Sequence, residues 1–127
     1  MPADTDRYES AVARYFEAWN AVDEETLTKA VAAAWAPDGT YTDPLTDVGG
    51  HEQIAAVIAV AHEQFPGYVF HPTATVDAHH DTARFSWELV NEADGSAPVA
   101  GFDVITLDEK GRIRSVLGFL DRVPAGA

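Results

Sequence analysis

Three segments in the first half of the chain place apolar residues at helical spacing. Over residues 8–19 the apolar positions recur every three or four residues, and Asp4 or Thr5 is the expected N-cap. Asp23 is suited to cap a second helix, and a third is expected from about His51 to Phe65. The apolar face of the second helix consists of Leu27, Ala30, Val31, Ala34 and Trp35, and that of the third consists of Ile54, Val57, Ile58 and Ala61.

Turn residues separate these helices. The sequence APDG at 36–39 is expected to end the second helix, and a short strand is expected at Thr40–Asp43. Pro44 and the Gly49-Gly50 pair then lead into the third helix, which Pro66-Gly67 closes.

The second half of the chain is rich in β-branched and aromatic residues. Strands are expected at Tyr68–Asp77, Thr82–Glu92, Pro98–Asp108 and Arg112–Asp121. The connections AHHD, ADGS and DEKG are short, so the four strands should form an antiparallel meander. Three helices followed by such a sheet predict a single α+β domain over residues 1–127, with the helices on one face of the sheet.

The last two strands carry large apolar residues on both faces, in the segments Val99–Ile105 and Val116–Leu120. An antiparallel sheet normally exposes one face to water. The helices can cover one face here, so the other needs a cover of its own. A homodimer is the simplest such cover.

Charge and composition exclude several classes of function. Lys and Arg number 8 against 21 Asp and Glu, and a net charge of -13 repels nucleic acid and anionic membrane surfaces. The chain has no cysteine, so disulfides, thiolate catalysis and cysteine-bound metals are excluded. No secretory signal and no apolar run of membrane-spanning length is visible, so a cytoplasmic location is expected.

Two aspartates are the strongest candidates for chemistry. Asp103 lies between Phe102 and Val104 in mid-strand and should be buried, so it must be paired, hydrogen-bonded or protonated. It could be a structural residue satisfied by a backbone amide or by Arg84, or a carboxyl group with a raised pKa that donates or shuttles a proton. Asp43 precedes proline, which suits a turn, yet it could equally be a carboxylate at the mouth of a pocket.

The aromatic residues are numerous for a small domain. They could form the core or line a cavity for a flat apolar ligand: Tyr15, Trp19, Trp35, Tyr41, Phe70, Phe85, Trp87 and Phe119. His71 lies beside Phe70 on a strand and could face such a cavity. The five histidines show no metal-binding spacing, so no metal site is expected.

An ordered set of motifs resembles the nuclear transport factor 2-like superfamily, and within it the ketosteroid isomerase and SnoaL-like polyketide cyclase branch. The set is RYFEAW, WAPDGTYTDPL, GGHEQIAAV, ARFSWEL and AGFDVITLDEKGRIRSVLGFLD, and it covers nearly the whole chain. The resemblance implies a cone-shaped roll, in which a strongly curved, mostly antiparallel sheet wraps around helices and opens into an apolar pocket. It also implies dimerisation through the outer face of the sheet.

The same resemblance implies roles for three residues in an isomerase that needs no cofactor. Asp43 matches the catalytic base, Tyr15 matches a hydrogen-bond donor to the developing oxyanion, and Asp103 matches a protonated aspartate that is a second donor. The implied substrate pocket consists of Trp19, Trp35, Tyr41, Phe70, His71, Phe85, Trp87 and Phe119.

Two other functions fit the resemblance. In SnoaL-like cyclases the aspartate that matches Asp103 is the acid/base for an intramolecular aldol closure. Other members of the superfamily use the fold without catalysis, which makes a dimeric small-molecule-binding protein the alternative. The expected partner in each case is a small apolar ligand.

Overall fold

The computed structural model of the chain describes residues 2–124, with side chains from Arg7 onward. The three helices are α1 Pro2–Asn20, α2 Glu24–Ala34 and α3 His51–Gln64. The strands are β1 Trp35–Asp43, β2 Thr46–Gly49, β3 Tyr68–Pro72, β4 Asp77–His79, β5 Thr82–Asn91, β6 Val99–Leu107 and β7 Ile113–Arg122. None of the described helices combines the length and apolar character needed to cross a membrane.

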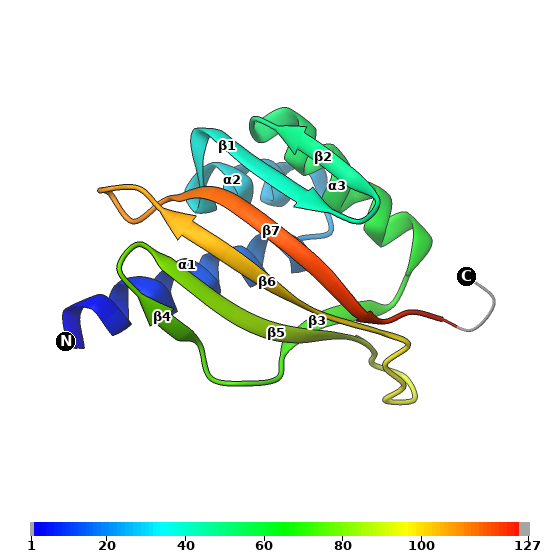
Figure 1. Cartoon of the computed structure of the whole chain (residues 1–127). Helices are drawn as coiled ribbons and strands as arrows, with labels where there is room; N and C mark the ends of the chain where they lie inside the picture. The colour runs from blue at the N-terminus through cyan, green and yellow to red at the C-terminus, as the bar shows by residue number, and fades with distance from the viewer. Residues whose placement is uncertain (1, 125–127) are drawn as a thin grey trace.

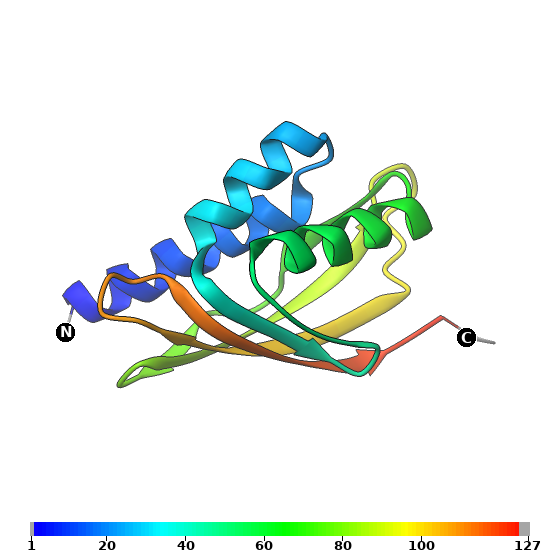
Figure 2. The same ribbon diagram turned by 90° about the horizontal axis from the view of Figure 1, so that it is seen from above.

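All seven strands belong to one mixed sheet, in the order β2-β1-β7-β6-β5-β3, and β4 extends the β3 side of β5 (Figure 1). The strands β5, β6 and β7 form the antiparallel meander that the sequence predicts. The three helices lie on one face of the curved sheet (Figure 2). The α+β class and the mostly antiparallel curved sheet are therefore confirmed.

The predicted helix boundaries need small corrections. Helix α1 already begins at Pro2, so neither Asp4 nor Thr5 is its N-cap. The Asp23 carboxylate caps α2 as predicted, because it accepts a hydrogen bond of 3.0 Å from the Thr26 amide. Trp35 follows α2 as the first residue of β1, so it lies on the sheet rather than on the helix.

Strand β1 begins earlier than predicted and pairs in an unexpected direction. It runs parallel to β7, with Trp35 opposite Ile113 and Thr40 opposite Ser115. Between these two pairs β1 advances five residues and β7 only two. The extra residues of β1, 36–39, therefore form a bulge. The His51 ring donates to the carbonyl oxygens of Trp35 (2.9 Å) and Ala36 (3.1 Å), which holds this bulge against α3. Strand β2, which the sequence pattern did not predict, forms a hairpin with β1.

The strand predicted at Tyr68–Asp77 is two strands. Pro72 of β3 pairs with Trp87 of β5, and Asp77 of β4 pairs with Arg84 of β5. Between these two pairs the chain advances five residues from Pro72 to Asp77, but β5 spans only three residues. Residues 73–76 absorb the difference outside the ladder, because proline cannot donate a ladder hydrogen bond and ends the regular pairing.

The core lies between the helices and the inner face of the sheet. Tyr8, Tyr15 and Trp19 of α1 pack onto it together with Val31 of α2 and Ile58 of α3. From the sheet, the inner positions alternate along β5 and β6 as Ala83, Phe85, Trp87 and Leu89, and as Gly101, Asp103, Ile105 and Leu107. Asp103 is thus one polar position in an otherwise apolar surface.

Candidate functional site

Asp103 is a buried carboxyl group that pairs with a tyrosine. Its side chain is 3% exposed on the inner face of β6, and the Tyr15 hydroxyl of α1 donates to its Oδ2 atom at 2.5 Å. The alternative partner Arg84 is ruled out, because it lies on the other face of the sheet and forms an ion pair with Asp77 at 3.4 Å. Tyr15 lies about one and a half helical turns before the end of α1. Its hydrogen bond to Asp103 therefore connects the helix to the sheet across the core.

Burial dominates the electrostatics of this pair. Loss of water raises the pKa of Asp103 to about 6, and the nearby Asp43 carboxylate adds to the rise. The hydrogen bond from Tyr15 opposes this rise in pKa, and the nearby indole of Trp87 also lowers it. Burial, followed by the Asp103 charge, also raises the pKa of Tyr15 well above the ordinary value for tyrosine. Tyr15 is therefore a neutral donor at physiological pH, and Asp103 can change its protonation state close to it.

Asp43 lies at the end of β1 and is partly buried. Its Oδ2 accepts from the Tyr41 hydroxyl at 2.6 Å, and its Oδ1 accepts from the Leu45 amide at 2.8 Å. The second contact is the turn interaction typical of aspartate before a bend. The pKa of Tyr41 is raised by burial first, then by the charges of Asp103 and Asp43. A second tyrosine–carboxylate pair thus stands next to the first.

Gly118 of β7 lies between the two carboxylates. It pairs with Asp103 on β6, and Thr42, the residue before Asp43, pairs with Leu117 on β7. A Cβ atom at position 118 would lie 2.8 Å from Asp103 Oδ1 and 3.3 Å from Asp43 Cβ. The absence of a side chain at this position leaves the two carboxylates on adjacent sides of one small space.

Aromatic rings enclose the pair of Tyr15 and Asp103. The ring of Tyr15 lies 5.2 Å from Phe85, 5.5 Å from Trp35 and 6.2 Å from Trp19 between centroids. Phe70 continues the cluster, at 5.0 Å from Trp19 and 5.4 Å from Trp87. Six of the predicted lining residues therefore gather around the site: Trp19, Trp35, Tyr41, Phe70, Phe85 and Trp87.

Three indole N–H groups in this cluster lack an acceptor. The Nε1 atoms of Trp19, Trp35 and Trp87 are buried and have no hydrogen-bond partner among the described residues. The Trp87 indole lies near Asp103 and lowers the pKa of that carboxyl group without reaching hydrogen-bond geometry. The Trp19 indole lies near Tyr15 and lowers the pKa of its hydroxyl group in the same way. Buried donors without partners are uncommon, and here they surround the polar pair.

Two predicted lining residues lie outside the cluster. His71 is exposed on β3, where its side chain alternates with that of Phe70. Phe119 is 50% exposed on the outer face of β7, where it stacks on Phe102 at 5.0 Å. Each is one position away from an inward-facing residue, which places its side chain on the opposite face of the sheet.

Sequence reasoning missed the polar role of Tyr41 and the role of Gly118. Tyr41 stands two positions before Asp43, so strand alternation already placed both on one face. Gly118 gave no signal, because its importance depends on which strands flank β7. Among the described residues, no three His, Asp or Glu side chains gather in a way that could hold a metal ion.

Residues 12–116 match the model of the SnoaL-like domain family. No curated protein matches the chain. A SnoaL-like protein from Agrobacterium tumefaciens, provisionally assigned as an isomerase, has a similar structure with a TM-score of 0.85 and 40% identity. That match covers 91% of this chain and 98% of the other.

Two more distant structures agree in fold. A SnoaL-like protein from Jannaschia, provisionally assigned as a polyketide cyclase, has a TM-score of 0.74 at 23% identity, over 91% of this chain and 86% of that one. A protein of unknown function from Nostoc punctiforme with a cystatin-like fold has a TM-score of 0.73 at 16% identity, over 98% and 96%. The family model and the 40% identical relative together show that the chain belongs to the SnoaL-like domain family.

Proposed function

We propose that this protein is a cofactor-independent enzyme that carries out carboxylate acid/base chemistry on a small apolar carbonyl compound. The observation that carries the proposal is the buried Tyr15–Asp103 hydrogen bond beside Asp43, with only Gly118 between the carboxylates. Burying a carboxyl group among aromatic rings lowers the stability of the fold, and such groups are typical of functional sites.

The chemistry assigns a separate role to each group. Asp43 removes a proton from the carbon next to the carbonyl, and negative charge develops on the carbonyl oxygen. Tyr15 donates a hydrogen bond to that oxygen in a dry surrounding, where such bonds are strong. Asp103 adds a second donor when it is protonated, which its pKa of about 6 favours at mildly acidic pH. The Tyr41 hydroxyl orients the Asp43 carboxylate through its bond of 2.6 Å.

The surroundings of the pair support an apolar, ring-containing ligand. The aromatic side chains offer flat apolar contact, and the free indole N–H groups of Trp19 and Trp87 can donate to a ligand oxygen. Asp43 is partly exposed whereas Asp103 and Tyr15 are buried, so a ligand would enter from the Asp43 side and displace aromatic rings. The 40% identical relative assigned as an isomerase agrees with this proposal.

The first test is the conversion of a β,γ-unsaturated ketosteroid to its conjugated enone, followed by ultraviolet absorbance. We expect turnover that falls by about two to four orders of magnitude in Asp43→Asn, because the general base is lost. Asp121→Asn is the matched control, since Asp121 is an exposed carboxylate on β7 outside the site. Equal activity in both variants would contradict the role of Asp43.

Asp103→Asn separates two roles for the second carboxyl group. Asparagine keeps a neutral hydrogen-bond donor but cannot exchange a proton. If Asp103 only donates to the oxyanion, the variant retains a substantial part of the activity. If Asp103 is the acid/base of a cyclase-type aldol closure, activity on a polyketide-type substrate is abolished.

A non-catalytic ligand-binding protein is the second candidate. It is favoured by the observation that both oxygens of Asp43 already accept hydrogen bonds, from Tyr41 and Leu45. This candidate predicts that a steroid raises the melting temperature without being converted, and that Asp43→Asn binds it as tightly as wild type.

A further inference from the structure

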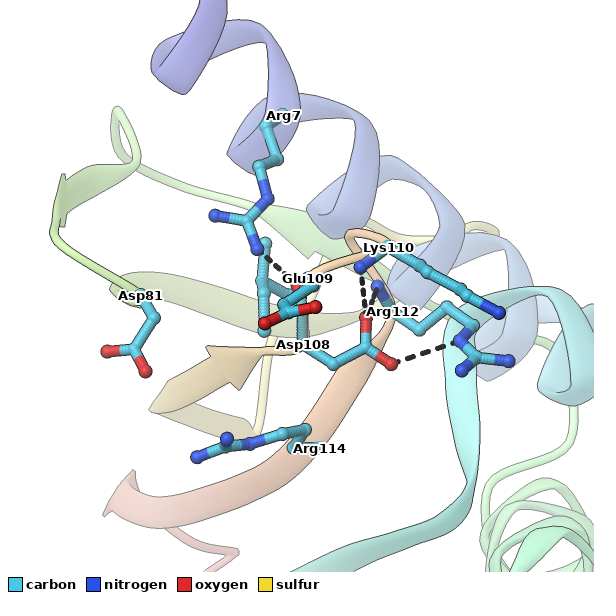
Figure 3. A pocket seen from close by; sticks show the side chains of 8 residues that line it. Arg7, Asp81, Asp108, Glu109, Lys110, Arg112 and Arg114 are labelled. Atoms are coloured by element: carbon cyan, nitrogen blue, oxygen red, sulfur yellow. Dashed lines mark hydrogen bonds and ion pairs between the residues drawn. The ribbon is translucent and has the colours of Figure 1, made fainter.

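A pocket lies at the C-terminal end of β6, whereas Asp103 of the candidate site lies in the middle of that strand. It has a volume of about 560 Å³ and is lined by Arg7, Asp81, Leu107, Asp108, Glu109, Lys110, Arg112 and Arg114. Leu107 and Asp103 are four positions apart on β6, which corresponds to about 13 Å along the strand. Figure 3 shows Arg7 reaching the pocket from α1 and Arg114 from β7, with Asp81 at a third edge.

The cations of this chain are divided between two environments. Four of the eight form ion pairs with carboxylates: Lys29, Arg84, Arg112 and Arg122. The other four form no ion pair with any described carboxylate, and they gather at the β6–β7 hairpin: Arg7, Arg14, Lys110 and Arg114. In a chain with 21 acidic residues, this separation gives the lining of the pocket a small excess of cations, four against the three carboxylates of Asp81, Asp108 and Glu109.

Hydrogen bonds hold the arginines of α1 in position without neutralising them. Arg7 donates to the carbonyl oxygen of Asp108, and Arg14 donates to that of Gly111 at 3.0 Å. A carbonyl carries no net charge, and a guanidinium has five N–H donors, so each arginine retains donors for another acceptor.

The carboxylate of Asp108, which lines the pocket, already has hydrogen-bond and ion-pair partners. Asp108 accepts from the amides of Lys110 and Arg112 at 2.9 Å each, and it forms an ion pair of 3.0 Å with the Arg112 side chain. These contacts fix the hairpin turn. The remaining charges facing the pocket are Arg7, Lys110 and Arg114 against Asp81 and Glu109.

We propose that this pocket binds a small anion through a carboxylate or phosphate group that accepts hydrogen bonds from Arg114, while Arg7 adds positive charge from another edge of the pocket. Guanidinium groups match the paired oxygens of both anions. A large polyanion is excluded as the natural ligand, because the net charge of -13 on the chain repels it. The anion occupies a site separate from the Tyr15–Asp103 pair.

The test is a titration of the full chain with inorganic phosphate, and separately with acetate, at constant ionic strength. Two-dimensional amide NMR should show saturable shifts at residues 107–114 and near Arg7 and Asp81. Saturation with only one of the two probes identifies the anionic group. Shifts that rise linearly without saturation, or that spread over the whole surface, would overturn the proposal.

Three variants make the test specific. Arg114→Gln should weaken binding by about tenfold, because a charge-assisted hydrogen bond is lost. Asp81→Asn should strengthen binding, since it removes a repelling carboxylate. Arg122→Gln removes the same charge from the other end of β7, about 26 Å away, and should leave binding unchanged. Equal affinity for Arg114→Gln and Arg122→Gln would contradict the site.

Discussion

At the scale of single residues, the burial of Asp103 lowers the stability of the fold. Its carboxyl group occupies an inner-face position that apolar residues fill elsewhere on β6, and Gly118 opposite leaves room for it. The Tyr15 hydroxyl and the Trp87 indole offset only part of the cost of burial, because the pKa of Asp103 still rises to about 6. A residue whose charged form the fold disfavours is expected at a functional site rather than in a core.

Asp103→Asn is expected to stabilise the protein at neutral pH. A pKa of about 6 in the folded state exceeds the ordinary 3.8, so the folded state binds its proton more tightly and loses stability as pH rises from about 4 to 6. Above that range the penalty is constant and amounts to at most about 3 kcal/mol, which the amide removes.

Urea unfolding at several pH values measures this effect. The stability difference between variant and wild type should vanish below about pH 4 and reach its full size near pH 7. Asp121→Asn, at an exposed position, should show little difference throughout. A pH-independent difference for Asp103→Asn would contradict the inferred titration.

At the scale of elements, the C-terminal end of α1 is fastened to the edge of the sheet. Asn20 donates to the Phe70 carbonyl at 3.0 Å and accepts from the Phe70 amide at 2.8 Å. The His62 ring of α3 donates to the Trp19 carbonyl at 2.7 Å. These bonds position Trp19 and Phe70, two walls of the candidate site, relative to each other.

Asn20→Ala is expected to lower the free energy of unfolding by about 1–3 kcal/mol, because both polar groups of Phe70 lose their partner at a partly buried position. Urea unfolding followed by tryptophan fluorescence measures the change. Lys29→Ala, which breaks an exposed pair on α2, should change stability by less than about 0.5 kcal/mol. A loss of unfolding free energy no larger than that of Lys29→Ala would show that the hydrogen bonds between Asn20 and Phe70 do not contribute to stability.

At the scale of the whole molecule, the outer face of the sheet carries an apolar patch. Phe102 and Phe119 stack at 5.0 Å with 13° between their planes, and Val104 pairs with Leu117 beside them. Leu117 is 47% exposed and Phe119 is 50% exposed. We propose that a second copy of the chain covers this patch, since a two-fold axis would bring it against itself.

Phe119→Glu is expected to convert a dimer into a monomer, because it places a charge, and across the axis a second like charge, in an apolar interface. Sedimentation equilibrium over a range of concentrations measures the change. Val22→Glu is the control, because Val22 is 78% exposed in the loop between α1 and α2. A wild-type protein that is monomeric at every concentration would contradict the proposed dimer.

Much of the fold was predictable because it depends on local pattern. Helical spacing predicted α1, α2 and α3, and alternation with short turns predicted the β5–β6–β7 meander. The apolar neighbours Phe102 and Val104 predicted that Asp103 is buried, and alternation along β6 places those two side chains on the outer face. The outward position of Phe119 follows from the same rule, but the family resemblance had favoured a place in the pocket.

The sequence by itself determined which residues form each helix and meander strand, and that a carboxyl group would be buried in β6. Only the tertiary structure decided that β1 lies parallel to β7, which brings Asp43 beside Gly118 and Asp103. The physical reason is that periodicity reports which side of an element faces the core, whereas pairing between distant strands depends on how the whole sheet closes over the helices.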